Sequence, residues 1–404
     1  MESQLRILHV ALLRFGSALA WNAVTMAKAL QERGHTCWMA GHADTPVLQR
    51  AEREGIPVPP ELRLPELRIW NWTRTVSRLR SFLVHHRADA IIVHTGSGHL
   101  EAHLARRGLN IPLVRVRSEA RPPRTDLPHR WLYRRGADRL VVSGAYLFER
   151  HLRPVGLDAR RVTVIPPGID INNSSWLPES GRRQARQDIR RRFEIPAGVP
   201  LIGMIGRLSP VKGHHTLIEA AALLAARGRD FRLLIVGEEK EVPVADLRDF
   251  GAELGLGERL IFTGFVEDPL LYASAFDVGV IPSLGSEALS RSALEFMAVG
   301  IPVVGSLVGV LPEMIEEDEL LVPPGRPEPL AEVLDRLLDD LTWAGRLGER
   351  GYRRVQDQYS LERLGERTEE LLLELVAERR TPRRKSRARD ERATGDRGDH
   401  RRPQ

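Results

Sequence analysis

The sequence has little cysteine, few aromatic residues and no long apolar runs, and each shortage excludes something. Cys37 is the one cysteine among 404 residues, so no disulfide can form within the chain, which fits a reducing compartment. Aromatic residues make up 5%, so a core must rely on Leu, Val, Ile and Ala. No apolar run approaches the roughly 18 residues of a transmembrane helix. With 42% hydrophobic and 28% charged residues, the composition is that of a folded globular protein.

The chain also lacks net charge outside its C-terminal end. Residues 379–404 hold eleven Lys and Arg against four Asp and Glu, and this difference of +7 is larger than the formal net charge of +6 for the whole chain. These residues include almost no apolar side chains, so they are predicted to form a disordered basic tail. The rest is close to neutral, which argues against a specific nucleic-acid partner. A nucleic-acid binder stays an alternative that rests on the tail alone.

The first twenty residues carry two competing signals. A mostly apolar stretch ends in Ser-Ala-Leu-Ala and imitates a signal peptide, but Arg14 interrupts it and His9 weakens it. A buried strand up to Leu13, a turn and a helix over 21–33 fit better. We therefore expect a cytoplasmic protein, with the inner face of the plasma membrane as a further location.

Short apolar strands alternate with helical stretches in both halves of the chain. Near-continuous apolar strands covered by helices indicate parallel sheets, so the fold class is α/β with two doubly wound, Rossmann-like domains around a central cleft. The predicted strands cover residues 7–12, 37–40, 90–94, 113–116, 140–143 and 162–165 in the first half, and 201–205, 232–236, 260–263, 278–281, 303–305 and 320–322 in the second.

Five segments follow from this pattern. Residues 1–168 form the first domain and 199–358 the second, with a polar connection over 169–198 that contains a short helix near 183–193. A long leucine-rich amphipathic helix spans 359–378 and is expected to cross back to the first domain, and the basic tail spans 379–404. Ligands of such sheets bind beyond the carboxyl ends of the strands, so the loops that follow strands are where chemistry is expected.

The loop after the strand 201–205 carries two cations. Arg207 and Lys212 lie five residues apart between this strand and the next helix. Both could meet one anion beside a helix N-terminus, where backbone N–H groups also point at it. A solvated loop with two ordinary cations explains the pattern equally well.

A pair of carboxylates follows the strand 278–281. Glu287 comes just past this strand, and Glu295 lies eight residues further on, in the next helix. A carboxylate accepts two hydrogen bonds side by side and therefore suits the vicinal hydroxyls of a sugar. The start of that helix, at Ser290–Ser292, supplies further N–H donors. Favourable interaction with the helix dipole is the plainer explanation for an acidic residue at this place.

Taken in order, these motifs resemble the retaining GT-B glycosyltransferases of family 4, also called group 1. The resemblance covers roughly residues 5–378 and is looser in the first half, where it rests on Gly16 and on Val164-Ile-Pro-Pro-Gly-Ile-Asp170. The matching segments of the second half are Gly206-Arg-Leu-x-Pro-x-Lys-Gly213, Gly264-Phe-Val266, the Glu287-x7-Glu295 pair, Met297-Ala-x-Gly-Ile-Pro-Val-Val304 and Val322-Pro-Pro-Gly325.

The resemblance implies a nucleotide-sugar donor, a hydroxyl acceptor and a role for each matching residue. Arg207 and Lys212 would bind the donor's diphosphate and stabilise it as the leaving group. Glu287 would contact the transferred sugar, and these three form the implied catalytic set. Glu295 would hold the ribose hydroxyls. The other implied donor-binding residues are Gly16, Gly206, Gly237, Val266, Ser290, Arg291 and Ser292.

No metal and no further cofactor are expected, because the two cations take the charge of the leaving group and the sequence has no Asp-x-Asp motif. His99 and His103 have metal-ligand spacing on a helix, but no third ligand is evident. The implied pathway is the assembly of cell-surface glycan, lipopolysaccharide or glycolipid.

Two departures from the family pattern leave specificity open. Many relatives have Gly-Phe-Gly after the first glutamate, where this chain has Ala288-Leu289-Ser290. On the acceptor side, a histidine often follows the fourth strand of the first domain, whereas here the chain continues into Ser118. His94 and Ser118 are the candidate acceptor-side residues, and a purely structural histidine is the alternative for the former.

Other functions remain open at this point. A nucleotide-sugar epimerase on the same fold is one alternative, and a non-catalytic relic that holds glycan or lipid is another. The stretch 67–87 is basic and amphipathic, with Trp70, Trp72 and Phe82 among several arginines, so an anionic membrane surface is a candidate partner. A helix that packs its apolar side on its own sheet is the favoured explanation for this stretch.

Overall fold

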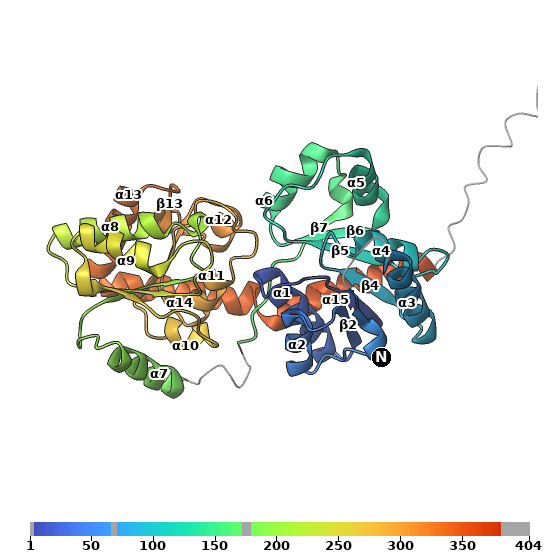
Figure 1. The fold of residues 1–404 in the computed structure, drawn as a ribbon, viewed down its shortest axis with the longest axis horizontal. Coiled ribbons are helices and arrows are strands. Elements are labelled where there is room, and N and C mark those ends of the chain that lie inside the picture. Colours follow the sequence, from blue (N-terminus) through green and yellow to red (C-terminus); the bar gives the residue numbers. More distant parts are fainter. Residues whose placement is uncertain (1–3, 66–70, 172–178, 381–404) are drawn as a thin grey trace, which may run out of the picture.

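The computed structural model describes residues 4–65, 71–171 and 179–380, and within them two parallel sheets form two domains (Figure 1). The N-terminal sheet has the order β3-β2-β1-β4-β5-β6-β7 and the C-terminal sheet the order β10-β9-β8-β11-β12-β13. The first strands are β1 (Arg6–Val10), β2 (Thr36–His42), β3 (Arg63–Leu64), β4 (Ala90–Val93), β5 (Leu113–Arg117), β6 (Arg139–Val142) and β7 (Val162–Val164). The later strands are β8 (Leu201–Ile205), β9 (Arg232–Val236), β10 (Leu260–Phe262), β11 (Val278–Ile281), β12 (Val303–Ser306) and β13 (Leu321–Val322).

The two doubly wound sheets confirm the predicted fold class, and the sequence analysis missed only one of these strands, the two-residue edge strand β3. In each sheet the strand order reverses once, between β1 and β4 and between β8 and β11. Crossovers on opposite sides of these points leave a crevice beyond the carboxyl ends of the strands. The loops after β8 and β11 therefore meet at one edge of the C-terminal sheet.

Helices cover both faces of each sheet because their apolar sides face the strands. The N-terminal helices are α1 (Ala18–Glu32), α2 (Pro46–Arg53), α3 (Trp72–His85), α4 (His99–Ala105), α5 (Leu127–Trp131) and α6 (Ala145–Leu147). The connection holds α7 (Glu179–Arg192), and the C-terminal helices are α8 (His214–Ala226), α9 (Val244–Glu253), α10 (Pro269–Ala273), α11 (Arg291–Ala298), α12 (Leu311–Met314), α13 (Pro327–Asp339), α14 (Leu341–Gln358) and α15 (Leu361–Arg380).

The last helix returns to the N-terminal domain, as the fold class predicted. Figure 1 shows α15 running from the C-terminal domain beneath the N-terminal sheet, and its leucines join the core that α1 covers. A Cβ at Gly365 would come within 2.9 Å of the Ala29 carbonyl oxygen, so this glycine permits close packing of the two helices. Glu369 of α15 is ion-paired with Arg33 and lies 2.8 Å from Nε2 of His35.

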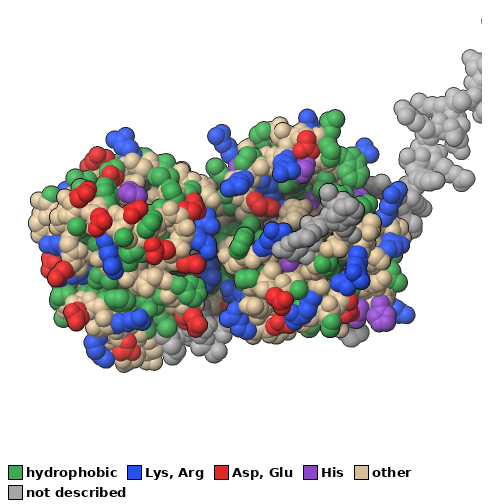
Figure 2. All heavy atoms as spheres, viewed as in Figure 1, with side chains coloured by type: hydrophobic (Ala, Val, Ile, Leu, Met, Phe, Trp, Pro, Cys, Tyr) green, Lys and Arg blue, Asp and Glu red, His purple; other side chains and the backbone are tan. Residues whose placement is uncertain are grey.

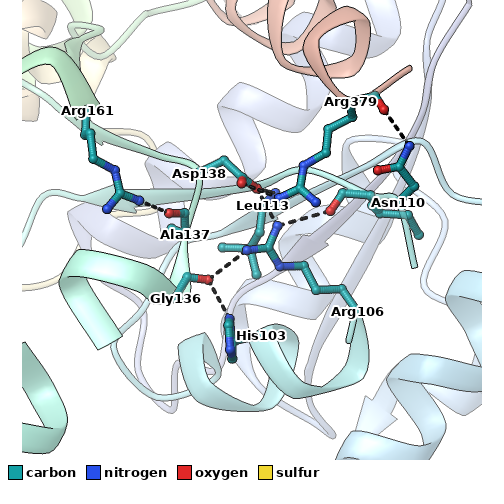
Figure 3. Close-up of polar contacts among 10 residues, drawn as sticks. His103, Arg106, Asn110, Leu113, Gly136, Ala137, Asp138, Arg161 and Arg379 are labelled. Atoms are coloured by element: carbon teal, nitrogen blue, oxygen red, sulfur yellow. Dashed lines mark hydrogen bonds and ion pairs between the residues drawn. The ribbon is translucent and has the colours of Figure 1, made fainter. Parts of the chain in front are cut away.

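The end of α15 is tied to the N-terminal domain by a polar network (Figure 3). Arg379 and Arg106 both pair with the carboxylate of Asp138, which also accepts the Leu113 amide at 2.8 Å. The Arg379 carbonyl oxygen accepts a hydrogen bond from Asn110 at 2.7 Å. Burial would raise the pKa of Asp138, but Arg106, the Leu113 amide and Arg379 outweigh burial and hold this pKa below its usual value. Arg379 thus belongs to the folded body, whereas 381–404 lie outside the described residues.

This network predicts where the chain can be shortened. We expect a chain ending at Arg380 to keep its melting temperature, while one ending at Glu378 melts several degrees lower near pH 7. Asp138 has a lowered pKa when folded, so its pairing contributes stability above the unfolded pKa of about 3.9 and loses it as pH falls through the folded value. The difference between the two chains should therefore vanish in acid. Melting curves from pH 7 to pH 3 test this, and insoluble protein from the chain that ends at Arg380 would refute it.

The amphipathic stretch 67–87 is helix α3 from Trp72 onward, and Leu79, Phe82 and Leu83 are buried in the core of their own domain. This packing agrees with the favoured explanation. Trp70 lies outside the described residues. Within the described ranges, no helix is both long and apolar enough to cross a bilayer.

Candidate functional site

The predicted site lies on loops of the C-terminal domain, where they face the N-terminal domain. Figure 2 shows a groove between the two lobes, with Lys and Arg side chains along it. Positive charge in a groove attracts anionic ligands and strengthens their binding. The residues below lie on the loops after β8 and β11 and on helix α11.

Glycine shapes the loop between β8 and α8. Gly213 has a φ of +75°, and a Cβ there would overlap the carbonyl oxygen of Pro282, just past β11. A Cβ at Gly237 would in the same way overlap the carbonyl oxygen of Gly206. Only glycine lets these backbones approach so closely. Both predicted glycines, Gly206 and Gly237, therefore lie where the β8 and β9 loops touch.

The close approach places Lys212 on Glu287. Lys212 Nζ lies 2.5 Å from Glu287 Oε1, although the two residues are 75 positions apart. Ser283 Oγ donates to the same oxygen at 2.6 Å, and the Glu287 side chain is only 2% exposed. The carboxylate is thus fixed by two donors, and the sequence analysis foresaw neither contact. Ser283 could have been found, since it is a polar residue two positions after a buried strand.

Arg207 is placed differently from Lys212. It follows β8 on the same loop, its side chain is exposed, and within the described part of the chain it has no ion-pair partner. An exposed guanidinium on a strand–helix loop can bind a phosphate bidentately without first breaking another contact. Among the described residues, the loop therefore offers one cation without an ion-pair partner, Arg207, and one that is paired with a carboxylate, Lys212.

Glu295 is buried at the boundary between the domains. Arg291 Nε lies 2.7 Å from its Oε1, and the Arg291 guanidinium stacks 5.1 Å above the ring of Trp21 in α1. Burial raises the pKa of Glu295, and Arg291 offsets only part of this effect. Arg50 of α2 also interacts electrostatically with Arg291 and Glu295. Burial, together with the positive charge of Arg291, lowers the pKa of Arg50 to about 10. Nothing in the sequence pattern indicated that Trp21 or Arg50 would lie here.

The raised pKa of Glu295 leads to a prediction about how the melting temperature depends on pH. An acid whose folded pKa is raised costs stability once pH exceeds its unfolded value, because burial disfavours the charged form. We therefore expect Glu295→Gln to melt at the wild-type temperature or higher at pH 7, and to lose this advantage near pH 4. Donor binding should weaken about tenfold or more if Glu295 holds ribose hydroxyls. Wild-type donor affinity in a stable Glu295→Gln protein would remove this residue from the site.

Ser290 has an unusual backbone. It precedes α11 with φ of 42° and ψ of 60°, the left-handed region that a non-glycine residue enters at a cost of about 1–2 kcal/mol. Its side chain is buried, and its hydroxyl has no hydrogen-bond partner in the described residues. Strain and an unpaired buried hydroxyl together are typical of functional positions. Arg291 and Ser292 follow it in the first turn of α11.

The other predicted residues lie further out. Gly16 is exposed, and a Cβ there would meet only Pro46, at an ordinary 3.7 Å. Val266 is half-buried after β10. No observation here tests their roles, which stay predictions.

On the acceptor side, His94 is buried and its Nε2 lies 3.0 Å from Nδ1 of His9. Burial, His9 and Arg115 hold the pKa of His94 well below its usual value, so the ring is neutral. Ser118 is buried as well, and its hydroxyl has no partner in the described residues. His103 Nδ1 lies 2.9 Å from the Gly136 carbonyl oxygen (Figure 3). Across the described ranges, no three His, Cys, Asp or Glu side chains gather to hold a metal ion.

Two family models match the chain and together cover about three quarters of it. Residues 20–173 match Glycosyltransferase Family 4, and residues 199–340 match Glycosyl transferases group 1.

Among known proteins, the 2-deoxystreptamine glucosyltransferase of Streptomyces kanamyceticus is 33% identical over 59% of this chain and 60% of its own length. The D-inositol 3-phosphate glycosyltransferase of Thermomonospora curvata is 33% identical over 51% of this chain and 50% of its own. The matches thus span only half to three fifths of these relatives.

Solved structures match over nearly the whole fold. A glycosyltransferase from Rickettsia africae has a TM-score of 0.81 at 19% identity, covering 93% of this chain and 99% of its own. Anabaena Alr3699/HepE in complex with UDP has a TM-score of 0.78 at 21% identity, covering 91% and 100%. Two Rossmann-like sheets with a returning C-terminal helix define a GT-B protein. Within that class, the chain belongs to glycosyltransferase family 4, the group 1 glycosyltransferases.

Proposed function

We propose that this protein transfers a sugar from a nucleoside-diphosphate donor to a hydroxyl group, with retention of configuration at the sugar. The observation that carries the proposal is the Lys212–Glu287 pair beside the free cation of Arg207, on loops after the adjacent strands β8 and β11. This arrangement puts two cations and one fixed carboxylate at the predicted cleft, which matches the needs of a departing diphosphate next to a reacting sugar.

Arg207, Lys212 and Glu287 are proposed to stabilise opposite charges in the transition state. As the bond between sugar and diphosphate breaks, negative charge grows on the phosphate oxygens and positive charge on the sugar ring. Arg207 and Lys212 oppose the first, while Glu287 lies where a carboxylate can face the second. Lys212 also fixes the orientation of the Glu287 carboxylate, because its Nζ lies 2.5 Å from Oε1 of that side chain. The acceptor's hydroxyl oxygen attacks the sugar from the same face and passes its proton to an oxygen of the departing diphosphate, without a covalent enzyme intermediate.

The donor is best sought among UDP-sugars. Anabaena Alr3699/HepE, which shares the fold, has been crystallised with UDP and with UDP-glucose. The acceptor is a hydroxyl compound, and a glycolipid at an anionic membrane surface stays the first candidate from the sequence. The names of two relatives add 2-deoxystreptamine and D-inositol 3-phosphate as acceptors to be tried.

The test begins with a thermal-shift screen of nucleotide sugars, because a donor that binds the folded chain raises its melting temperature. The stabilising donor is then incubated with each acceptor, and the product's anomeric configuration is read by NMR. Transfer with retention supports the proposal. Isomerisation of the donor without transfer would favour an epimerase, and binding without any turnover would favour a non-catalytic relic.

A further inference from the structure

The two domains meet in a contact that the donor site does not require. After β6, residues Ser143 and Gly144 lead into α6, and α6 faces α12 of the other domain (Figure 1). The carboxylate of Glu313 in α12 accepts two successive backbone N–H groups, from Ala145 at 2.7 Å and from Tyr146 at 2.6 Å. A carboxylate that accepts two N–H groups at the start of a helical turn makes strong, charge-assisted hydrogen bonds.

The backbone around this contact is shaped to permit it. A Cβ at Gly144 would lie 2.7 Å from Val310 Cγ1 and 2.8 Å from Glu313 Oε2. A side chain at Gly144 would therefore meet Val310 and Glu313, and the Glu313 carboxylate would have to move from its present position. Ser143 Oγ donates to the carbonyl oxygen of Ala288, so the segment from Ser143 to Tyr146 contacts the C-terminal domain at two points, Ala288 and Glu313.

Both contacts involve segments next to Glu287. Ser143 binds the carbonyl oxygen of Ala288, which directly follows Glu287 in the chain. On the other side, the Val310 amide donates to the Glu287 carbonyl oxygen at 2.8 Å, three residues before Glu313. Gly309 has a φ of +62°, and a Cβ there would overlap the same carbonyl oxygen. The carbonyl groups of Glu287 and Ala288 thus accept hydrogen bonds from opposite sides, one from Val310, just before α12, and one from Ser143, just before α6.

We propose that Glu313 is a positioning residue: by binding the α6 turn of the opposite domain, it closes the domains over the site and fixes the Glu287 loop for turnover. Glu313 is solvent-exposed, so water competes for the carboxylate and the contact can open between cycles. The contribution to catalysis rests on the proposed function, whereas the closing contact itself does not.

The experiment compares wild type with Glu313→Ala, Glu313→Gln and Ser143→Ala. Most of the residues proposed to bind the donor lie in the C-terminal domain, so we expect the affinity for UDP to change less than about threefold, while kcat with the stabilising donor falls about tenfold or more in Glu313→Ala. Glu313→Gln should lie in between, because its amide oxygen still accepts one N–H group. Glu319→Ala removes another exposed glutamate of this domain and serves as the control with unchanged kcat.

Small-angle X-ray scattering supplies the readout that a purely structural role would not move. We expect the radius of gyration of Glu313→Ala with UDP to exceed that of wild type, with equal melting temperatures. An unchanged kcat, a loss of UDP affinity equal to the loss of kcat, or a collapsed melting temperature would each overturn the proposal. If wild type transfers no sugar at all, the proposed function fails, and the scattering comparison alone decides whether Glu313 closes the domains.

Discussion

Arg207→Ala and Lys212→Ala are each expected to lower the rate of sugar transfer at least about 100-fold, equivalent to about 2.7 kcal/mol of transition-state stabilisation. The charge on the diphosphate grows as the sugar leaves, so a cation at the phosphates acts more strongly on the transition state than on the bound donor. Initial rates at saturating donor measure this. Near-normal turnover in both variants would contradict the assignment.

The two variants need different controls because their partners differ. Arg207 is exposed and unpaired in the described residues, so its loss should leave stability unchanged, and Arg346→Ala is a matched loss of an exposed arginine that has no ion pair in the described part of the same domain. Lys212→Ala leaves the buried Glu287 carboxylate without its cation, which destabilises the fold. The double variant Lys212→Met with Glu287→Gln removes both charges and should recover stability without recovering activity. Recovery of both would mean that the pair is structural.

Glu287→Gln is expected to reduce kcat about 100-fold or more, with a change of less than about threefold in KM for the donor. Glutamine preserves the shape and can still accept a hydrogen bond from Ser283 or Lys212, but it cannot stabilise positive charge on the sugar ring. A loss confined to kcat reports a contact made in the transition state. A loss confined to KM would assign Glu287 to donor binding and exchange its role with that of Glu295.

Ser283→Ala provides the graded comparison for this prediction. Its hydroxyl donates to Glu287 Oε1 at 2.6 Å, so its removal frees the carboxylate to rotate while the charge and the Lys212 contact remain. We expect a loss of about tenfold in kcat, smaller than that of Glu287→Gln. A Ser283→Ala variant as slow as Glu287→Gln would show that orientation of the carboxylate, rather than its charge, limits the rate.

The sequence alone was enough to place most of the regular elements. Strand β8 was predicted with its exact limits, because five apolar residues in a row are bounded by Pro200 and Gly206. The parallel sheets and their order-reversing strands followed from the alternation of such strands with helices, since both faces of a parallel sheet must be covered. Edge strand β3 was missed because two residues carry no periodic signal.

In the candidate site, too, some features followed from the sequence and others only from the fold. The sequence determined that Arg207, Lys212, Glu287 and Glu295 follow strands, because residue type and spacing are local properties. Only the tertiary structure decided that Lys212 pairs with Glu287 and that Arg207 has no ion-pair partner in the described part of the chain. The sheet order sets β8 beside β11, and the absence of a Cβ at Gly213 lets their loops touch. The same holds for Trp21 above Arg291 and for Glu313 on the α6 turn. These contacts join residues that are far apart in the chain, and a local pattern cannot encode how two separately folded sheets approach each other.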